Sequence, residues 1–243
     1  MGSCHFYLEF LLTWLSLLAE SGYRNPAIFA LEYTLVPDAC FFTQLQEAIA
    51  SYEHVLSRIG DPGKICVSGD SAGASIMLSL LLHLSHMGRH SEKMNELGAW
   101  RLPKPGMAAF ISPWVTLVSD KHRNTRSDYL DADNLHIYGH QYSGGKVAVD
   151  DPLISPGDCR DVSWWKHACP DKGIHIEYGA EEVFASDIQD FLKFLEGNRI
   201  KVSGRREPGG IHAWPVACLF LSTSLEERQK GLRDLITHIR ENI

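Results

Sequence analysis

The stretch Lys64-Ile-Cys-Val-Ser-Gly-Asp-Ser-Ala-Gly73 decides the fold, because it joins a strand-like run to an apolar helical run through a Gly-x-Ser-x-Gly turn. The residues before Gly69 favour a strand, and apolar residues recur at helical spacing after Ser71. A serine at such a turn projects its hydroxyl above the sheet, and the helix N-terminus offers free N–H groups to a developing oxyanion. This context makes Ser71 a candidate nucleophile, against the alternative of a tight turn with an idle serine.

The rest of the chain repeats this alternation of short apolar runs and amphipathic runs. Strands are expected at residues 27–33, 64–68, 106–111, 173–178 and 200–203, and helices at residues 6–19, 41–56, 71–84, 186–197 and 225–239. Ser186 and Gln189 fit a capping box at the start of one of these helices. Strands that alternate with helices predict an α/β fold with a mostly parallel sheet flanked by helices on both faces.

Residues 119–151 are polar and fit neither the strand period nor the helix period. Such a stretch is too long for a simple connection, so we expect a lid-like insertion. The 243 residues contain 44% hydrophobic residues, which is enough for one sizeable core. We therefore expect one domain that spans residues 1–243 and contains the insertion.

The composition argues against several classes of function. Lys and Arg number 23 against 30 Asp and Glu, and the net charge of −7 disfavours binding to nucleic acid or to an anionic membrane surface. The apolar run at residues 6–19 is interrupted by Glu9 and is too short to span a bilayer. Six cysteines form no Cys-x-x-Cys pair, which favours free thiols in a reducing, cytoplasmic compartment. No metal, nucleotide or flavin motif is present, so no cofactor is expected.

A serine nucleophile needs a base, and the base needs an acid, so both are sought further along the chain. His212 lies in the flexible turn Pro208-Gly-Gly-Ile-His-Ala-Trp214, directly after the last expected strand. Glu181 and Glu182 lie in the loop after the preceding strand. Asp187 lies in the first turn of the next helix, where a carboxylate also complements the helix dipole. The loop at the end of a strand is where a triad acid belongs, and position alone does not separate Glu181 from Glu182; Asp187 stays as a third candidate.

Six short motifs, spread over most of the chain, carry a further signal. They are Glu32-Tyr-Thr-Leu-Val-Pro37, Gly69-Asp-Ser-Ala-Gly73, Ile111-Ser-Pro-Trp114, Asp151-Pro-Leu-Ile-Ser-Pro156, Gly179-Ala-Glu-Glu-Val-Phe184 and Gly210-Ile-His212. Together they resemble the hormone-sensitive-lipase branch of the α/β-hydrolases, and most of all its fungal esterases and acetyl hydrolases. The resemblance implies a catalytic triad of Ser71, Glu182 and His212, with the N–H of Ala72 as one oxyanion donor. It also implies a serine esterase of secondary metabolism that cleaves short, acetyl-like esters of small apolar molecules.

The chain departs from this family at one place. The family carries a His-Gly-Gly-Gly loop whose N–H groups complete the oxyanion hole, and this tetrapeptide is absent here. Because residues 2–9 resemble the stretch just after that loop, the resemblance implies a chain without the family's N-terminal cap and first three strands. The third of those strands lies between the strands expected here at residues 27–33 and 64–68. These two are therefore expected either to leave a gap or to pair directly.

The absence of this loop supports a second hypothesis of weak or no catalysis, because loss of one oxyanion donor costs about 10²–10³-fold in rate. The chain is then a catalytically impaired hydrolase, or a non-catalytic module that binds a ligand or a protein partner. Its retention of the serine and the histidine favours an enzyme, and acyl transfer to an alcohol stays open beside hydrolysis. Three tryptophans are candidates for a pocket lining and equally for the core: Trp114, Trp164 and Trp165.

Overall fold

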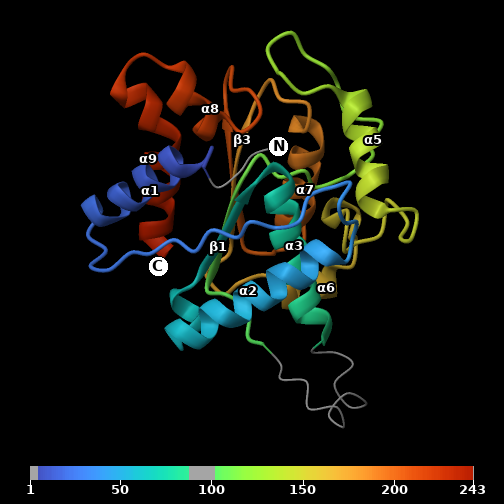
Figure 1. Ribbon diagram of the computed structural model, residues 1–243, viewed down its shortest axis with the longest axis horizontal. Helices are drawn as coiled ribbons and strands as arrows, with labels where there is room; N and C mark the ends of the chain where they lie inside the picture. Colours follow the sequence, from blue (N-terminus) through green and yellow to red (C-terminus); the bar gives the residue numbers. More distant parts are fainter. Residues whose placement is uncertain (1–4, 88–101, 243) are drawn as a thin grey trace.

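A sheet of four parallel strands forms the centre of the molecule (Figure 1). The computed structural model describes residues 5–87 and 102–242. The strands lie in chain order: β1 (Cys66–Asp70), β2 (Met107–Ile111), β3 (Ile174–Gly179) and β4 (Val202–Glu207). The register pairs Asp70 with Ile111, and Gly179 with Glu207. Because all four strands run the same way, their carboxyl ends meet at one edge of the sheet.

Helices cover both faces of this sheet, as the sequence predicted. The helical elements are α1 (Leu8–Glu20), α2 (Thr43–Ile59), η1 (Pro62–Lys64), α3 (Ser71–Met87), α5 (Ala132–Ser143), η3 (Pro156–Asp158), α6 (Val162–Ala168), α7 (Ala185–Gly197), α8 (Trp214–Leu221) and α9 (Leu225–Asn242). In the described ranges, no helix is both long enough and apolar enough to cross a bilayer.

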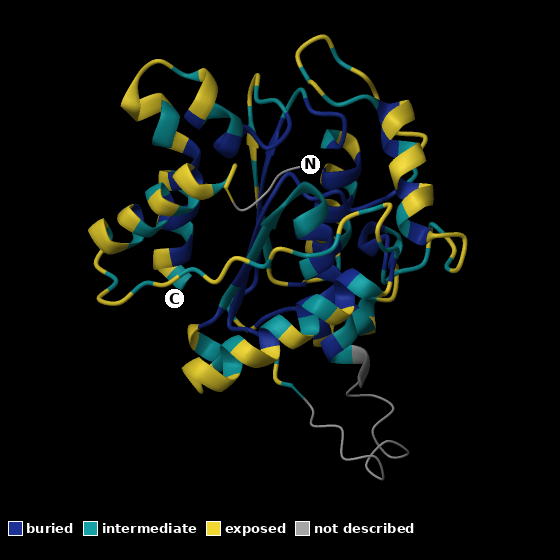
Figure 2. Cartoon of the chain, viewed as in Figure 1, coloured by how far each residue is buried: buried dark blue, intermediate teal, exposed yellow. Residues whose placement is uncertain are grey.

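Alternation along β2 separates the core into two clusters. Ala108 and Phe110 face the larger cluster, with α2, α3, α6 and α7. Met107, Ala109 and Ile111 face the smaller cluster, with α1, α8 and α9. The central strands are dark blue in Figure 2, which marks burial on both faces. A strand buried on both faces reads as a continuous apolar run, which is why β2 was recognisable in the sequence.

The prediction of a strand at residues 27–33 is wrong. The segment runs from α1 to α2 across β1 (Figure 1), and it is extended but forms no ladder. It does not pair directly with β1, and no described strand occupies that edge of β1. Phe29 is 55% exposed, and much of the segment is yellow in Figure 2. Strand propensity largely measures packing against neighbouring strands, so a strand-like sequence without a partner forms no strand.

Smaller corrections concern helix ends and short helices. The prediction of a capping box at Ser186 is wrong, because α7 begins at Ala185 and Ser186 lies inside its first turn. The Ala185 N–H donates to the Glu182 carbonyl, so the turn is already closed by backbone. The last strand is found, shifted to Val202–Glu207. The sequence patterns missed α5, α6 and α8; α8 is apolar on all sides, so it lacks the stripe that identifies a helix.

Candidate active site

The carboxyl ends of the four strands each deliver one polar side chain to the same edge of the sheet. Ser71 follows β1 and Ser112 follows β2 directly, while Glu182 and His212 lie in the loops after β3 and β4. In parallel α/β sheets this edge is where ligands bind. The fold thus brings the three predicted triad residues to one edge of the sheet, together with a second serine that was not predicted.

Ser71 is the first residue of α3 and adopts a left-handed backbone conformation, with φ +51°. A non-glycine residue in this region is strained, and such strain is typical of a functional turn. Gly69 makes the turn possible, because a Cβ there would lie 2.6 Å from the Gly73 carbonyl carbon. Ala72 is the second residue of α3, so its N–H belongs to the first four of the helix, which have no intrahelical acceptor.

Glu182 and His212 are both buried and face each other. The distance from Glu182 Oε1 to His212 Nδ1 is 3.9 Å, and neither atom has another hydrogen-bond partner within the described chain. Glu182 Oε2 is held on the other side by the Ser112 hydroxyl at 2.6 Å and by the Gly179 N–H at 2.8 Å. Catalytic hydrogen bonds often tighten when substrate binds, so this separation suits an acid and base poised to pair.

Asp187, an alternative candidate for the acid, is engaged elsewhere. Its Oδ2 lies 3.4 Å from His122 Nε2, and its Oδ1 accepts a hydrogen bond from the Ser119 hydroxyl. Burial raises the pKa of the Asp187 carboxyl and lowers the pKa of His122 to about 4. Glu181, the third candidate, donates its N–H to the Gly210 carbonyl and so ties the two loops through backbone.

A chain of contacts connects Ser71, the candidate nucleophile, to His212, the candidate base. The backbone N–H of Trp114 donates to the Ser71 carbonyl at 3.2 Å. The Trp114 ring stacks on the Phe184 ring, with 5.6 Å between the ring centroids. Phe184 in turn meets the His212 ring edge-on at 5.2 Å. Trp114 therefore lies at the site. Trp165, by contrast, is fully buried in the core, and the Trp164 indole donates to the Leu82 carbonyl away from the strand ends.

Residues not predicted from the sequence complete the surroundings. Ser112 has φ +45°, and its hydroxyl accepts the Ala213 N–H while donating to Glu182. Its place directly after a buried strand, as for Ser71, is the signal that could have identified it. Tyr7 donates its hydroxyl to Asp70 Oδ2 at 2.7 Å. Burial raises the pKa of the Asp70 carboxyl, and the Tyr7 hydrogen bond and nearby His212 oppose that rise.

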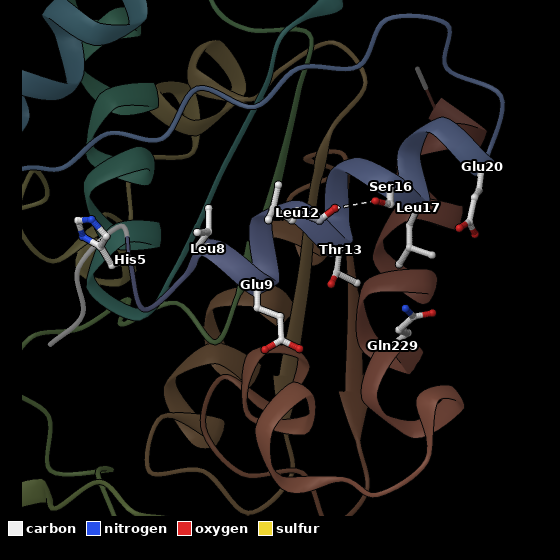
Figure 3. A pocket seen from close by; sticks show the side chains of 9 residues that line it. All are labelled: His5, Leu8, Glu9, Leu12, Thr13, Ser16, Leu17, Glu20 and Gln229. Carbon is white, nitrogen blue, oxygen red and sulfur yellow. Dashed lines mark hydrogen bonds between the residues drawn. The ribbon is translucent and has the colours of Figure 1, made fainter.

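Two surface grooves lie away from Ser71. The groove in Figure 3 has a volume of about 510 Å³ and runs along α1. It is lined by His5, Leu8, Glu9, Leu12, Thr13, Ser16, Leu17, Glu20 and Gln229. The second, of about 520 Å³, borders residues 207–211 and α8. Neither groove is lined by Ser71, Glu182 or His212.

The comparisons with known proteins agree with the fold. Residues 14–216 match the family described as alpha/beta hydrolase fold. An acetyl-hydrolase of Streptomyces hygroscopicus is 27% identical over 194 residues, which are 77% of this chain and 57% of that protein. Esterase LipU of Mycobacterium tuberculosis is 23% identical over 236 residues, or 91% of this chain and 69% of the esterase. The chain thus spans a little over half the length of the first of these relatives.

Solved structures extend the likeness to the whole fold. An esterase from the bacterial hormone-sensitive lipase family superposes with a TM-score of 0.78 at 20% identity, covering 100% of this chain and 73% of the esterase. EstE5, in a crystal soaked with p-nitrophenyl butyrate, superposes with a TM-score of 0.75 at 21% identity, covering 100% of this chain and 72% of EstE5. At these identities the likeness shows the fold.

Proposed function

The chain belongs to the α/β-hydrolase family and resembles its hormone-sensitive-lipase branch, and on that premise we propose that it hydrolyses carboxylic esters. The substrates are esters of short, acetyl-like acyl groups with small apolar alcohols. The observation that carries the proposal is the strained Ser71, with φ +51°, at the same sheet edge as the facing Glu182–His212 pair. A positioned nucleophile, a base and an orienting acid are three of the groups that serine-dependent acyl transfer uses.

In the proposed reaction, Ser71 Oγ attacks the ester carbonyl carbon while His212 takes its proton. The tetrahedral oxyanion accepts a hydrogen bond from the Ala72 N–H. The intermediate collapses, the bond to the alcohol oxygen breaks, and His212 returns the proton to that oxygen. Water then attacks the acyl-serine, with His212 as base again, which releases the carboxylic acid and restores the serine. Glu182 holds the histidine ring in its orientation and stabilises the imidazolium.

Two observations support the substrate class. A relative is named an acetyl-hydrolase, and this name suggests the acetyl group as the acyl part. The net charge of −7 disfavours anionic substrates.

The first test is hydrolysis of p-nitrophenyl acetate and p-nitrophenyl butyrate, with a fluorophosphonate probe for the serine. We expect hydrolysis and labelling by the parent chain, no labelling of Ser71→Ala, and weak labelling of His212→Ala. Circular dichroism checks that each variant is folded. Hydrolysis that survives in Ser71→Ala would overturn the assignment of the nucleophile.

A second candidate function rests on one observation, the absence of the His-Gly-Gly-Gly tetrapeptide from the 243 residues. An oxyanion hole built on the Ala72 N–H without that loop would stabilise the oxyanion less, and the same scaffold would then bind an ester-like ligand with little turnover. A folded chain that neither hydrolyses the esters nor reacts with the probe would favour this binding function.

A further inference from the structure

We propose that Asp128 is a positioning residue for the acid–base pair, and this inference rests on the proposed function. Asp128 lies in the insertion at residues 119–151, far in sequence from both loops of the pair. Its carboxylate joins the backbone of the acid loop to the backbone of the base, and so fixes the separation at which Glu182 and His212 work.

The geometry of the Asp128 carboxylate is the main support. Its Oδ1 accepts the N–H of His212 at 3.1 Å, and its Oδ2 accepts the N–H of Val183 at 2.8 Å. Val183 directly follows Glu182, so one side chain binds the base itself and the residue next to the acid. Hydrogen bonds to an ionised acceptor are stronger than those between neutral groups, which makes this carboxylate an effective clamp.

Asp128 is itself held in place by the turn that carries it. The Asp128 N–H donates to the Thr125 hydroxyl at 3.1 Å, and that hydroxyl donates to the Glu181 carbonyl at 2.7 Å. The next residue, Tyr129, donates its hydroxyl to the His212 carbonyl at 3.3 Å. The segment from 125 to 129 therefore contacts both loops with hydroxyl and carboxylate groups, and its position follows from bonds at both ends.

The clamp complements the contact that Ser112 makes from β2. Ser112 donates to the Glu182 side chain and accepts the Ala213 N–H, so it joins the same two loops from the buried side. Asp128 joins them from the partly exposed side, through backbone groups only. Because Glu182 Oε1 and His212 Nδ1 are 3.9 Å apart, a small shift of either loop decides whether they can pair. Misplacement of a catalytic group by about 1 Å can cost about 10²-fold in rate.

Asp128→Ala and Asp128→Asn test the clamp, with Asp131→Ala as the matched control. The amide of asparagine keeps one acceptor oxygen but turns an NH₂ group toward the second N–H, so it can replace only half of the clamp. Asp131 lies three residues away, where its carboxylate caps α5 through the Asn134 N–H and binds the Asn124 side chain. Its loss weakens the insertion without removing a bond to either loop.

The readouts are kcat and KM with p-nitrophenyl butyrate. We expect Asp128→Ala to lower kcat by about 10–100-fold with KM changed less than about threefold, because the clamp orients the acid–base pair and does not bind substrate. Asp128→Asn is expected to lie between Asp128→Ala and the parent chain, and Asp131→Ala close to the parent chain. Equal losses in Asp128→Ala and Asp131→Ala, or a loss confined to KM, would overturn the clamp.

Amide hydrogen exchange gives a readout that does not depend on turnover. In Asp128→Asn we expect faster exchange at Val183 and His212, while the Glu181 amide, which donates to the Gly210 carbonyl, keeps its protection. A double-mutant cycle with Glu182→Gln completes the test, because a residue that acts through the acid–base pair adds little loss once the acid is gone. Additive losses, or unchanged exchange at both amides, contradict the inference.

The outcomes separate this inference from the proposed function. If His212→Ala keeps the activity of the parent chain, the proposed function fails. If His212→Ala is inactive while Asp128→Ala keeps the parent kcat, the proposed function stands and the clamp alone is wrong.

Discussion

The two sides of the sheet hold the proposed catalytic groups in different ways. On the side of β3 and β4, the strands pair with neighbours and two side chains, Ser112 and Asp128, tie the acid and base loops together. On the side of β1, the strand pairs with β2 and with no other strand of the described residues, and the chain at residues 27–33 lies across it without a ladder. Ser71 therefore owes its position to a strained backbone turn and to α3, whereas Glu182 and His212 owe theirs to bonds between loops.

This difference shows which contacts fix the positions of the side chains in the site. A turn such as the one at Ser71 is set by residues close in sequence, above all Gly69, so it needs little help from the rest of the sheet. The acid–base pair is assembled from segments that are far apart in sequence, and it depends on cross-links that only the folded chain supplies. Perturbations on the two sides should accordingly have different consequences.

The largest expected effect comes from a substitution in the acid–base pair itself. Glu182→Gln should lower kcat by about 10³–10⁴-fold, because a neutral amide cannot stabilise the imidazolium and can favour the wrong tautomer of His212. Asp187→Asn should cost far less, since its carboxylate faces His122. Steady-state kinetics of both variants decide the question, and the reverse order of losses would remove Glu182 from the triad.

The next effect compares a phenylalanine from each side by its contribution to stability. Phe191→Ala removes a buried ring that meets Trp165 edge-on in the core behind β3 and β4, and should destabilise the chain by about 3–5 kcal/mol. Phe29→Ala removes a ring that is 55% exposed on the β1 side, and should change stability by less than about 0.5 kcal/mol. Denaturant unfolding measures both. A large loss from Phe29→Ala would show that residues 27–33 are packed in solution.

The smallest expected effect is a pH dependence of the stability, and it comes from two buried groups of β3. Burial raises the pKa of the Glu177 carboxyl to about 8, although Arg205 opposes the rise, and burial lowers the pKa of neighbouring His175 to about 4. The folded chain keeps the Glu177 proton after the unfolded chain has lost it, so this group lowers stability as pH rises from about 4.5 to about 8. His175 acts in the opposite direction, raising stability between about pH 4 and 6.5.

Between about pH 6.5 and 8 the effect of Glu177 is therefore not offset by His175. We expect Glu177→Gln to remove a fall in stability of roughly 1 kcal/mol per pH unit in that window. Unfolding of both chains by denaturant at several pH values measures the slope. Parallel stability curves for the two chains would mean that Glu177 is already ionised in the folded state.

The features that the sequence predicted correctly are those encoded by neighbouring residues, and the features that it missed depend on residues far apart in the chain. The turn at Ser71, the apolar run of β2 and the helix α3 were predictable because each is encoded within a few neighbouring residues. The strand expected at residues 27–33 failed because a strand depends on its partner, which local pattern does not describe. The roles of Ser112 and Asp128 were missed because hydrogen bonds between residues 70 and 55 positions apart leave no periodic trace in the chain, although the place of Ser112 directly after a buried strand was visible.

The delivery of one polar side chain by each of four strands has a consequence for folding. Ser71 and His212 are 141 positions apart in sequence (212 − 71), and every strand between them must be in register before they meet. Closing such long loops is slow compared with forming helices, so secondary structure returns early on dilution from denaturant. If the proposed function holds, catalysis is then expected to be the last property that a refolding chain regains, and the first that partial unfolding removes.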